Sequence, residues 1–129
     1  MIIDIHTHTF PDKIAARTLE KLQHMSHTRA FTDGTVDGLK ASMEAAGVDR
    51  SLVLPVATNT HQVVHVNDAS ARINERSGET GIFSFGCMHP DFEDWKGELA
   101  RVASMGLKGI KLHPVYQNVD FDDLRYLRI

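Results

Sequence analysis

Features that mark several specialised protein classes are scarce in this chain of 129 residues. It has a single cysteine, Cys87, so no disulfide can form within the chain. No long apolar run predicts a membrane-spanning helix, and the basic and apolar segments of a signal peptide are lacking at the N-terminus. Fourteen Lys and Arg against seventeen Asp and Glu give a charge of -3, without the basic excess that nucleic acid requires. We therefore expect a cytoplasmic protein that binds neither nucleic acid nor membrane.

What the chain does contain is typical of one globular domain over residues 1–129, with 42% hydrophobic and 24% charged residues. Short apolar runs alternate with longer amphipathic stretches, a pattern that indicates repeated strand and helix units. Strands are predicted at 2–6, 51–56, 82–87 and 108–112, and helices at 12–25, 36–46, 61–76 and 92–105.

The intervals between these strands decide the fold class. Because ten or more residues and a helix separate consecutive strands, the strands are expected to be parallel, with right-handed crossovers. The later intervals approach the roughly 31 residues per unit of a (β/α)8 barrel, which has ~250 residues in eight units. The sequence therefore predicts an α/β fold that forms the first half of a TIM barrel, apparently truncated after the fourth strand. A flavodoxin-like open sheet is the alternative.

The opening strand carries the first candidate site. A strand period of two places Asp4, His6 and His8 on one face and Ile3 and Ile5 on the other. Polar residues in register at the C-terminal end of a strand are typical of a barrel rim, where active sites form. Two imidazoles two residues apart can reach one cation, which favours a divalent transition metal. The structural alternative is a pair of solvent-facing histidines.

Three segments of the sequence resemble the amidohydrolase superfamily, in particular its amidohydrolase-related branch. They are Asp4-Ile-His-Thr-His8, the stretch 44–49 leading into 51–55, and Gly106-Leu-Lys-Gly-Ile-Lys-Leu-His-Pro114. The resemblance implies a barrel whose metal is held by the opening histidine pair, by later histidines and by an aspartate near the last strand. His6 and His8 match that pair, and the expected ion is Zn²⁺. The implied activity is metal-dependent hydrolysis of a small molecule, with nonoxidative decarboxylation as the alternative in the same family.

The fourth predicted strand repeats the alternation. Lys111 and His113 are expected on the lumen side, and Ile110 and Leu112 toward the helices. Lys111 is a candidate substrate-binding residue with Asp4 as a possible partner, because a lysine inside a barrel needs a counter-charge or water. His113 is a candidate metal ligand or anion-binding residue, and the structural alternative is a hydrogen-bonded histidine behind the site.

The remaining histidines are less informative. His89 ends the third predicted strand and is therefore a candidate substrate-binding residue at the same rim. His61 and His65 are four residues apart on a predicted helix, but without a third ligand or a glutamate base a solvated helix face is the better interpretation.

Half a barrel cannot close on itself. Its last strand would expose unpaired backbone groups and an apolar lumen face, so a homo-oligomer is expected. The later ligands implied by the resemblance would also be missing. A catalytically incomplete half-barrel that assembles with another chain is therefore the competing hypothesis to an enzyme.

Overall fold

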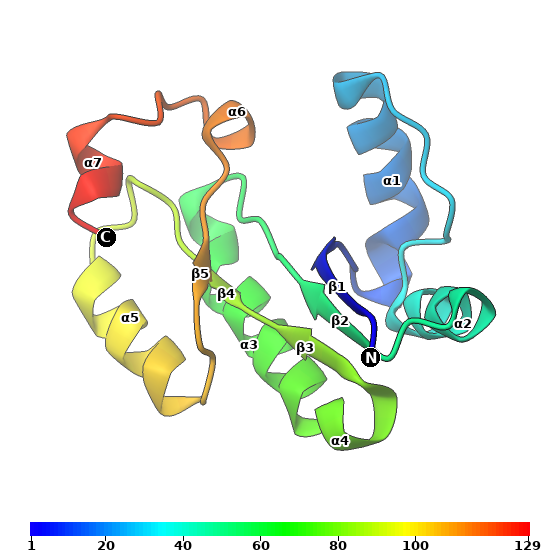
Figure 1. The fold of residues 1–129 in the computed structure, drawn as a ribbon. Coiled ribbons are helices and arrows are strands. Elements are labelled where there is room, and N and C mark those ends of the chain that lie inside the picture. The colour runs from blue at the N-terminus through cyan, green and yellow to red at the C-terminus, as the bar shows by residue number, and fades with distance from the viewer.

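The computed structural model describes the backbone of residues 1–129 and every side chain except those of residues 25 and 26 (Figure 1). Its strands are β1 (Ile3–Thr7), β2 (Arg50–Val53), β3 (Ile82–Ser84), β4 (Gly86–Cys87) and β5 (Ile110–Lys111). Its helices are α1 (Asp12–Ser26), α2 (Val36–Ala46), the 3-10 turn η1 (Thr60–Gln62), α3 (Val63–Glu75), α4 (Ser77–Thr80), α5 (Trp95–Ser104), α6 (Pro114–Gln117) and α7 (Leu124–Leu127).

The strands are parallel and follow one another in sequence order, as predicted. One sheet has the order β1-β2-β3, and β4 pairs with β5 in a second sheet. A flavodoxin-like sheet places its first strand between the second and the third, so the observed order differs from that alternative. The mixed α/β architecture with parallel strands is confirmed, and it is consistent with part of a barrel.

The third predicted strand, 82–87, is divided at Phe85, where the chain changes its pairing partner. The Phe85 N–H donates to the Val53 carbonyl of β2, whereas the next N–H, that of Gly86, donates to the Gly109 carbonyl before β5. Consecutive N–H groups of a strand point to opposite edges, so one edge is paired before Phe85 and the other after it. Two short strands therefore replace the single strand that the apolar run predicts.

Two asparagines of α3 bind the edges that this change leaves unpaired. Asn74 accepts from the Ser84 N–H at 2.7 Å and donates to the Ser84 carbonyl at 3.1 Å. Asn67 likewise accepts from the Cys87 N–H at 2.7 Å and donates to the Cys87 carbonyl at 3.2 Å. The two asparagines are seven residues apart, and hence on one face of the helix. Each side-chain amide takes the place of a neighbouring strand.

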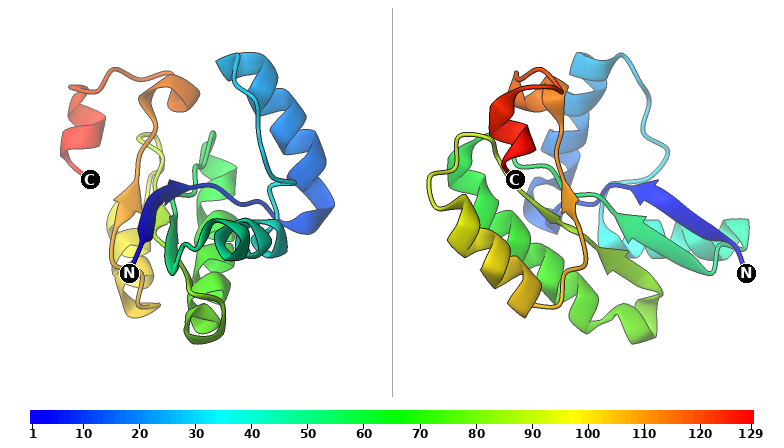
Figure 2. Two further views of the ribbon diagram at one scale, coloured as in Figure 1. Left: turned by 45° about the vertical axis from the view of Figure 1, so that its right-hand side comes forward. Right: turned by 60° about the vertical axis from the view of Figure 1, so that its left-hand side comes forward.

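The helices α2, α3 and α5 cover one face of the strands, and Figure 2 shows α3 and α5 on the same side. One buried cluster joins α2 to the first sheet through Leu39, Met43, Val53 and Ile82. A second cluster joins α3 and α5 to the other strands through Ala57, Val63, Cys87 and Met88, with Ile110 and Leu112 packed against it. The helix-facing orientation predicted for Ile110 and Leu112 agrees with this packing.

The opposite face of β1–β3 is open, and here one prediction is wrong. Ile3 and Ile5 do not face the helices, because they line a cavity of about 510 Å³ together with Leu52, Phe83 and Phe85. Their exposed fractions are 51% and 69%. The first strand therefore presents apolar residues to the side where the sequence predicted only polar ones.

Local signals fix the helix ends. The Thr35 hydroxyl accepts from the Gly38 N–H and begins α2 at the predicted residue, and Gly47 ends it with φ 68°. The helix predicted from residue 92 begins instead at Trp95, since the Asp94 carboxylate caps the Gly97 N–H. No helix in the described part of the chain is long and apolar enough to span a bilayer.

Candidate metal and acid site

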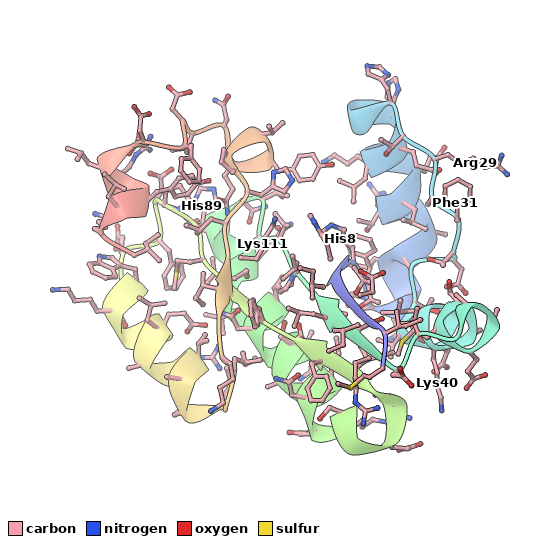
Figure 3. All side chains as sticks on the ribbon, viewed as in Figure 1. His8, Arg29, Phe31, Lys40, His89 and Lys111 are labelled. Atoms are coloured by element: carbon pink, nitrogen blue, oxygen red, sulfur yellow. The ribbon has the colours of Figure 1, made fainter. Side chains whose placement is uncertain are left out.

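The two histidines of the opening segment lie together at the C-terminal end of β1. Their ring centroids are 5.1 Å apart, and the rings meet edge to face at 69°. Figure 3 shows His8 above β1, on the side that faces β5. The predicted convergence of His6 and His8 is therefore present in the fold.

A hydrogen bond determines the protonation of His8. Its Nδ1 lies 2.8 Å from the Leu54 carbonyl, just after β2. A carbonyl can only accept, so Nδ1 carries the hydrogen and the neutral ring keeps its lone pair on Nε2. This tautomer is the one that a metal ligand requires at Nε2.

The surroundings of His8 keep the ring neutral. Desolvation by the surrounding protein is the main cause that lowers its pKa below 6.5, although the Leu54 hydrogen bond acts in the opposite direction. The positive charges of His6, Lys111 and His113 lower the pKa further. His6 lies beside His8 on the same segment, whereas Lys111 and His113 come from the other end of the chain.

His113 has the opposite tautomer. Its Nδ1 accepts the Tyr116 N–H at 3.3 Å and so caps α6. The His113 and Tyr116 rings are stacked, with 4.0 Å between their centroids. The hydrogen of the neutral ring therefore lies on Nε2, which is a donor. Desolvation is the main cause of a lowered His113 pKa, followed by the charge of Lys111. A donor beside an ammonium group suits an anion better than a metal ion.

Asp4 stands apart from this group of basic residues. It forms no ion pair with Lys111 among the contacts of the described residues. Its carboxylate accepts the His6 N–H at 3.0 Å instead. The suggested pairing of Asp4 with Lys111 is thus not found in this structure.

His89 belongs to different surroundings. It is 7% exposed, and its Nδ1 accepts the Asp91 N–H at 3.2 Å. Asp91 is in turn bound by Arg125 of the segment around α7, at 2.7 Å. Figure 3 shows His89 near α7, well separated from His8. The structure does not bring His89 to the site that holds His6 and His8.

The complete ligand set of a metal centre is not assembled here. Within the described residues no group of three or more His, Cys, Asp or Glu side chains is arranged to hold an ion. The described residues therefore bring two imidazoles together without a third ligand. The sequence analysis missed the Leu54 carbonyl and Tyr116, which select the two tautomers. The Pro114 that follows His113 was a usable signal, because proline favours the first helical position and marks His113 as a cap.

Comparisons with known proteins support the fold. No protein-family model matches the sequence, and a search of curated proteins finds no match. The fold is similar to that of a probable 2-pyrone-4,6-dicarboxylic acid hydrolase from Acinetobacter baumannii, solved with citric acid bound. The TM-score is 0.56 at 14% sequence identity, and the match covers 98% of this chain and 43% of that one. The fold of this chain is thus similar to that of less than half of the longer protein.

Proposed function

We propose that this chain forms the metal-binding side of a hydrolase of the amidohydrolase-related type. His6 and His8 would hold a divalent ion, for which we expect Zn²⁺. The observation that carries the proposal is the 2.8 Å contact between His8 Nδ1 and the Leu54 carbonyl. Metal-binding histidines almost always donate their second N–H to an oxygen acceptor, which fixes the ring and frees the other nitrogen. The similarity to a hydrolase fold is in keeping with this activity.

The donor chemistry fits such an ion but is incomplete. Neutral imidazoles suit Zn²⁺, and the lowered pKa of His8 keeps its Nε2 lone pair available at neutral pH. When bound, a divalent ion supplies a water of lowered pKa and polarises a substrate carbonyl. Catalytic zinc sites commonly have three protein ligands. The proposal therefore requires a ligand beyond those that the described residues bring together.

The substrate class we propose is a small carboxylic acid. Lys111 offers an ammonium group, and two residues further along the chain His113 offers an Nε2–H donor, since its Nδ1 accepts the Tyr116 N–H. A cation and a neutral donor side by side are a good match for a carboxylate. The hydrolase of similar fold is named for a dicarboxylic acid and holds citric acid. His89 is not part of this proposed site, because the structure holds it near α7 and away from His8.

Zinc titration by calorimetry tests the metal site. We expect the His8→Ala variant to lose Zn²⁺ binding, because it removes the oriented Nε2 ligand. The matched control is His61→Ala, an exposed histidine on η1. Unchanged binding in the His8 variant, or equal losses in both variants, would place the ion elsewhere and refute the proposal.

Citrate binding and hydrolysis of 2-pyrone-4,6-dicarboxylate test the acid site. Lys111→Ala is expected to weaken citrate binding, whereas Lys40→Ala, on α2 and away from the site in Figure 3, is expected to leave it unchanged. Hydrolysis is followed with the metal-loaded protein. Citrate binding that is insensitive to Lys111 would contradict the assignment of the substrate class.

A further inference from the structure

Gln117, the last residue of α6, is a buried polar residue that has no part in the proposed function so far. It is 6% exposed, and its side-chain amide is bound at both ends. Nε2 donates to the Ala57 carbonyl and to the Met88 carbonyl, each at 2.7 Å. Oε1 accepts from the His113 N–H at 3.2 Å and from the Tyr126 hydroxyl. Both donor hydrogens and both lone pairs of the amide are thus in use.

Three of these partners follow the ends of different strands. Met88 comes directly after β4, His113 comes two residues after β5, and Ala57 comes four residues after β2. The carboxyl ends of parallel strands meet at one edge, where a single amide can reach all of them. Ala57 and Met88 are completely buried, so their carbonyls need a donor within the protein. Gln117 supplies that donor and joins the three chain segments.

Gln117 also completes the cap that orients His113. The His113 ring begins α6 by accepting the Tyr116 N–H at Nδ1, and the Gln117 side chain reaches back to the His113 N–H. A capping box has the same reciprocal pair of hydrogen bonds, between the cap residue and a Glu or Gln of the first turn. The backbone and the ring of His113 are therefore both fixed, and its Nε2–H donor has one orientation.

The segment after β2 connects this arrangement to the other histidine of the proposed site. The Leu54 carbonyl lies 2.8 Å from His8 Nδ1, and the Ala57 carbonyl, three residues later, accepts from Gln117. One short stretch of chain thus binds His8 directly and His113 through the Gln117 amide. A change at Gln117 would alter the position of His113 without touching the partner of His8.

We propose that Gln117 is the positioning residue of the substrate site, which fixes the His113 donor relative to the segment that orients His8. The assignment of His113 to a substrate carboxylate rests on the proposed function, whereas its orientation by Gln117 does not. The competing interpretation is that Gln117 only stabilises the fold. The two interpretations differ in what happens to the His113 ring when the amide is removed.

Nitrogen NMR of the imidazole rings, above the pKa of His113, distinguishes the two roles because it shows which nitrogen carries the hydrogen. We expect the Nε2–H tautomer in the wild type. Gln117→Ala is expected to give a mixture of tautomers, because the loosened α6 turn no longer holds the Tyr116 N–H against Nδ1. Asn74→Ala is the matched control, since it removes an amide that binds strand backbone at Ser84 instead. We expect this control to lose stability and keep the tautomer.

Two further measurements apply if the alanine variant does not fold. Gln117→Glu keeps the length of the side chain and an acceptor for the His113 N–H, so we expect it to retain more of the Nε2–H tautomer than alanine does. Hydrogen exchange of the wild type needs no variant, and we expect the His113 amide to exchange slowly. Fast exchange there would overturn the proposal. So would a pure Nε2–H tautomer in Gln117→Ala, or an equal change in Asn74→Ala.

Citrate titration by calorimetry connects the positioning role to the substrate, at a temperature where circular dichroism shows folded variants. We expect Gln117→Ala to weaken citrate binding about tenfold, the effect of losing one oriented hydrogen bond to a charged group, and Asn74→Ala to leave it unchanged. A changed tautomer with unaltered citrate affinity would refute the positioning of the substrate site. A wild type that has the expected tautomer but binds no citrate would instead refute the proposed substrate class and leave the orientation of His113 by Gln117 intact.

Discussion

Replacing Asn67 by alanine tests how the broken strand is held. Asn67 is completely buried, and its amide makes hydrogen bonds to the Cys87 N–H, the Cys87 carbonyl and Glu98. Alanine would leave both backbone groups of Cys87 buried without these partners. An unsatisfied buried group costs about 1–3 kcal/mol. We therefore expect the free energy of unfolding to fall by about 3 kcal/mol, a large share of the ~5–15 kcal/mol of a typical domain.

The assay is urea unfolding followed by circular dichroism, at one fixed protein concentration so that association contributes equally. Asn59→Ala is the matched control, because this exposed asparagine makes no side-chain cap, and its effect is expected within about 0.5 kcal/mol. Asn67→Asp is expected to be at least as damaging as alanine. Its carboxylate accepts from the Cys87 N–H but faces the Cys87 carbonyl and the Glu98 carboxylate.

The outcome that refutes this reasoning is specific. If Asn67→Ala unfolds within about 1 kcal/mol of the wild type, the Cys87 backbone does not depend on the asparagine, and the edge is satisfied by other means. Asn74→Ala provides the internal comparison. It removes two hydrogen bonds to Ser84 at a half-buried position, so its loss is expected to be the smaller of the two.

Three other perturbations follow from the same structure. Gly109→Ala places a Cβ 2.6 Å from the Phe85 ring, so we expect a loss of about 1–3 kcal/mol in the same urea assay, with partial recovery in the double variant with Phe85→Leu. Burial raises the pKa of Cys87 to about 12, so a thiol reagent such as DTNB is expected to react only after unfolding; fast reaction in the native state would contradict this. Desolvation lowers the pKa of His89, so the unfolded chain takes up a proton before the folded one does. Stability is therefore expected to fall as the pH drops below 6.5, and the Tm of His89→Gln is expected to fall less.

The sequence predicted the parts of the fold that depend on local pattern. The start of α2 at Thr35 and its end at Gly47 follow from capping chemistry, and both are found. The parallel strands follow from the long helical connections between them. The division of the third strand at Phe85 was not predictable from its apolar run, because it depends on which neighbour each edge meets. Asn67 and Asn74 are the one sequence signal of this division. Asparagine is a poor helix former, so two of them seven residues apart on one helix indicate side chains that bind backbone groups elsewhere.

The sequence predicted that His6 and His8 come together, but it did not predict the tautomer of any histidine. The spacing of His6 and His8 indicates a shared position, and the rings do meet. Spacing cannot show which nitrogen carries a hydrogen, because that depends on acceptors and donors distant in sequence or on a helix cap. The Leu54 carbonyl makes His8 a candidate ligand, and the Tyr116 N–H makes His113 a donor. The same residue type therefore has two different tautomers, each set by its own backbone partner.

One extra residue in β1 explains why His6 and His8 lie on the same side of the sheet as Ile5, although the sequence predicted opposite sides. From Asp4 to Thr7 the strand advances three residues, while its partner advances two, from Ser51 to Val53. Asp4 and Thr7 therefore share the helix-covered face with Ser51 and Val53, although strict alternation would separate them. The neighbours of Thr7 in the strand, His6 and His8, then turn to the open side where Ile5 already lies. The irregularity thus brings the two histidines to the side of the sheet that already carries the apolar residues of β1.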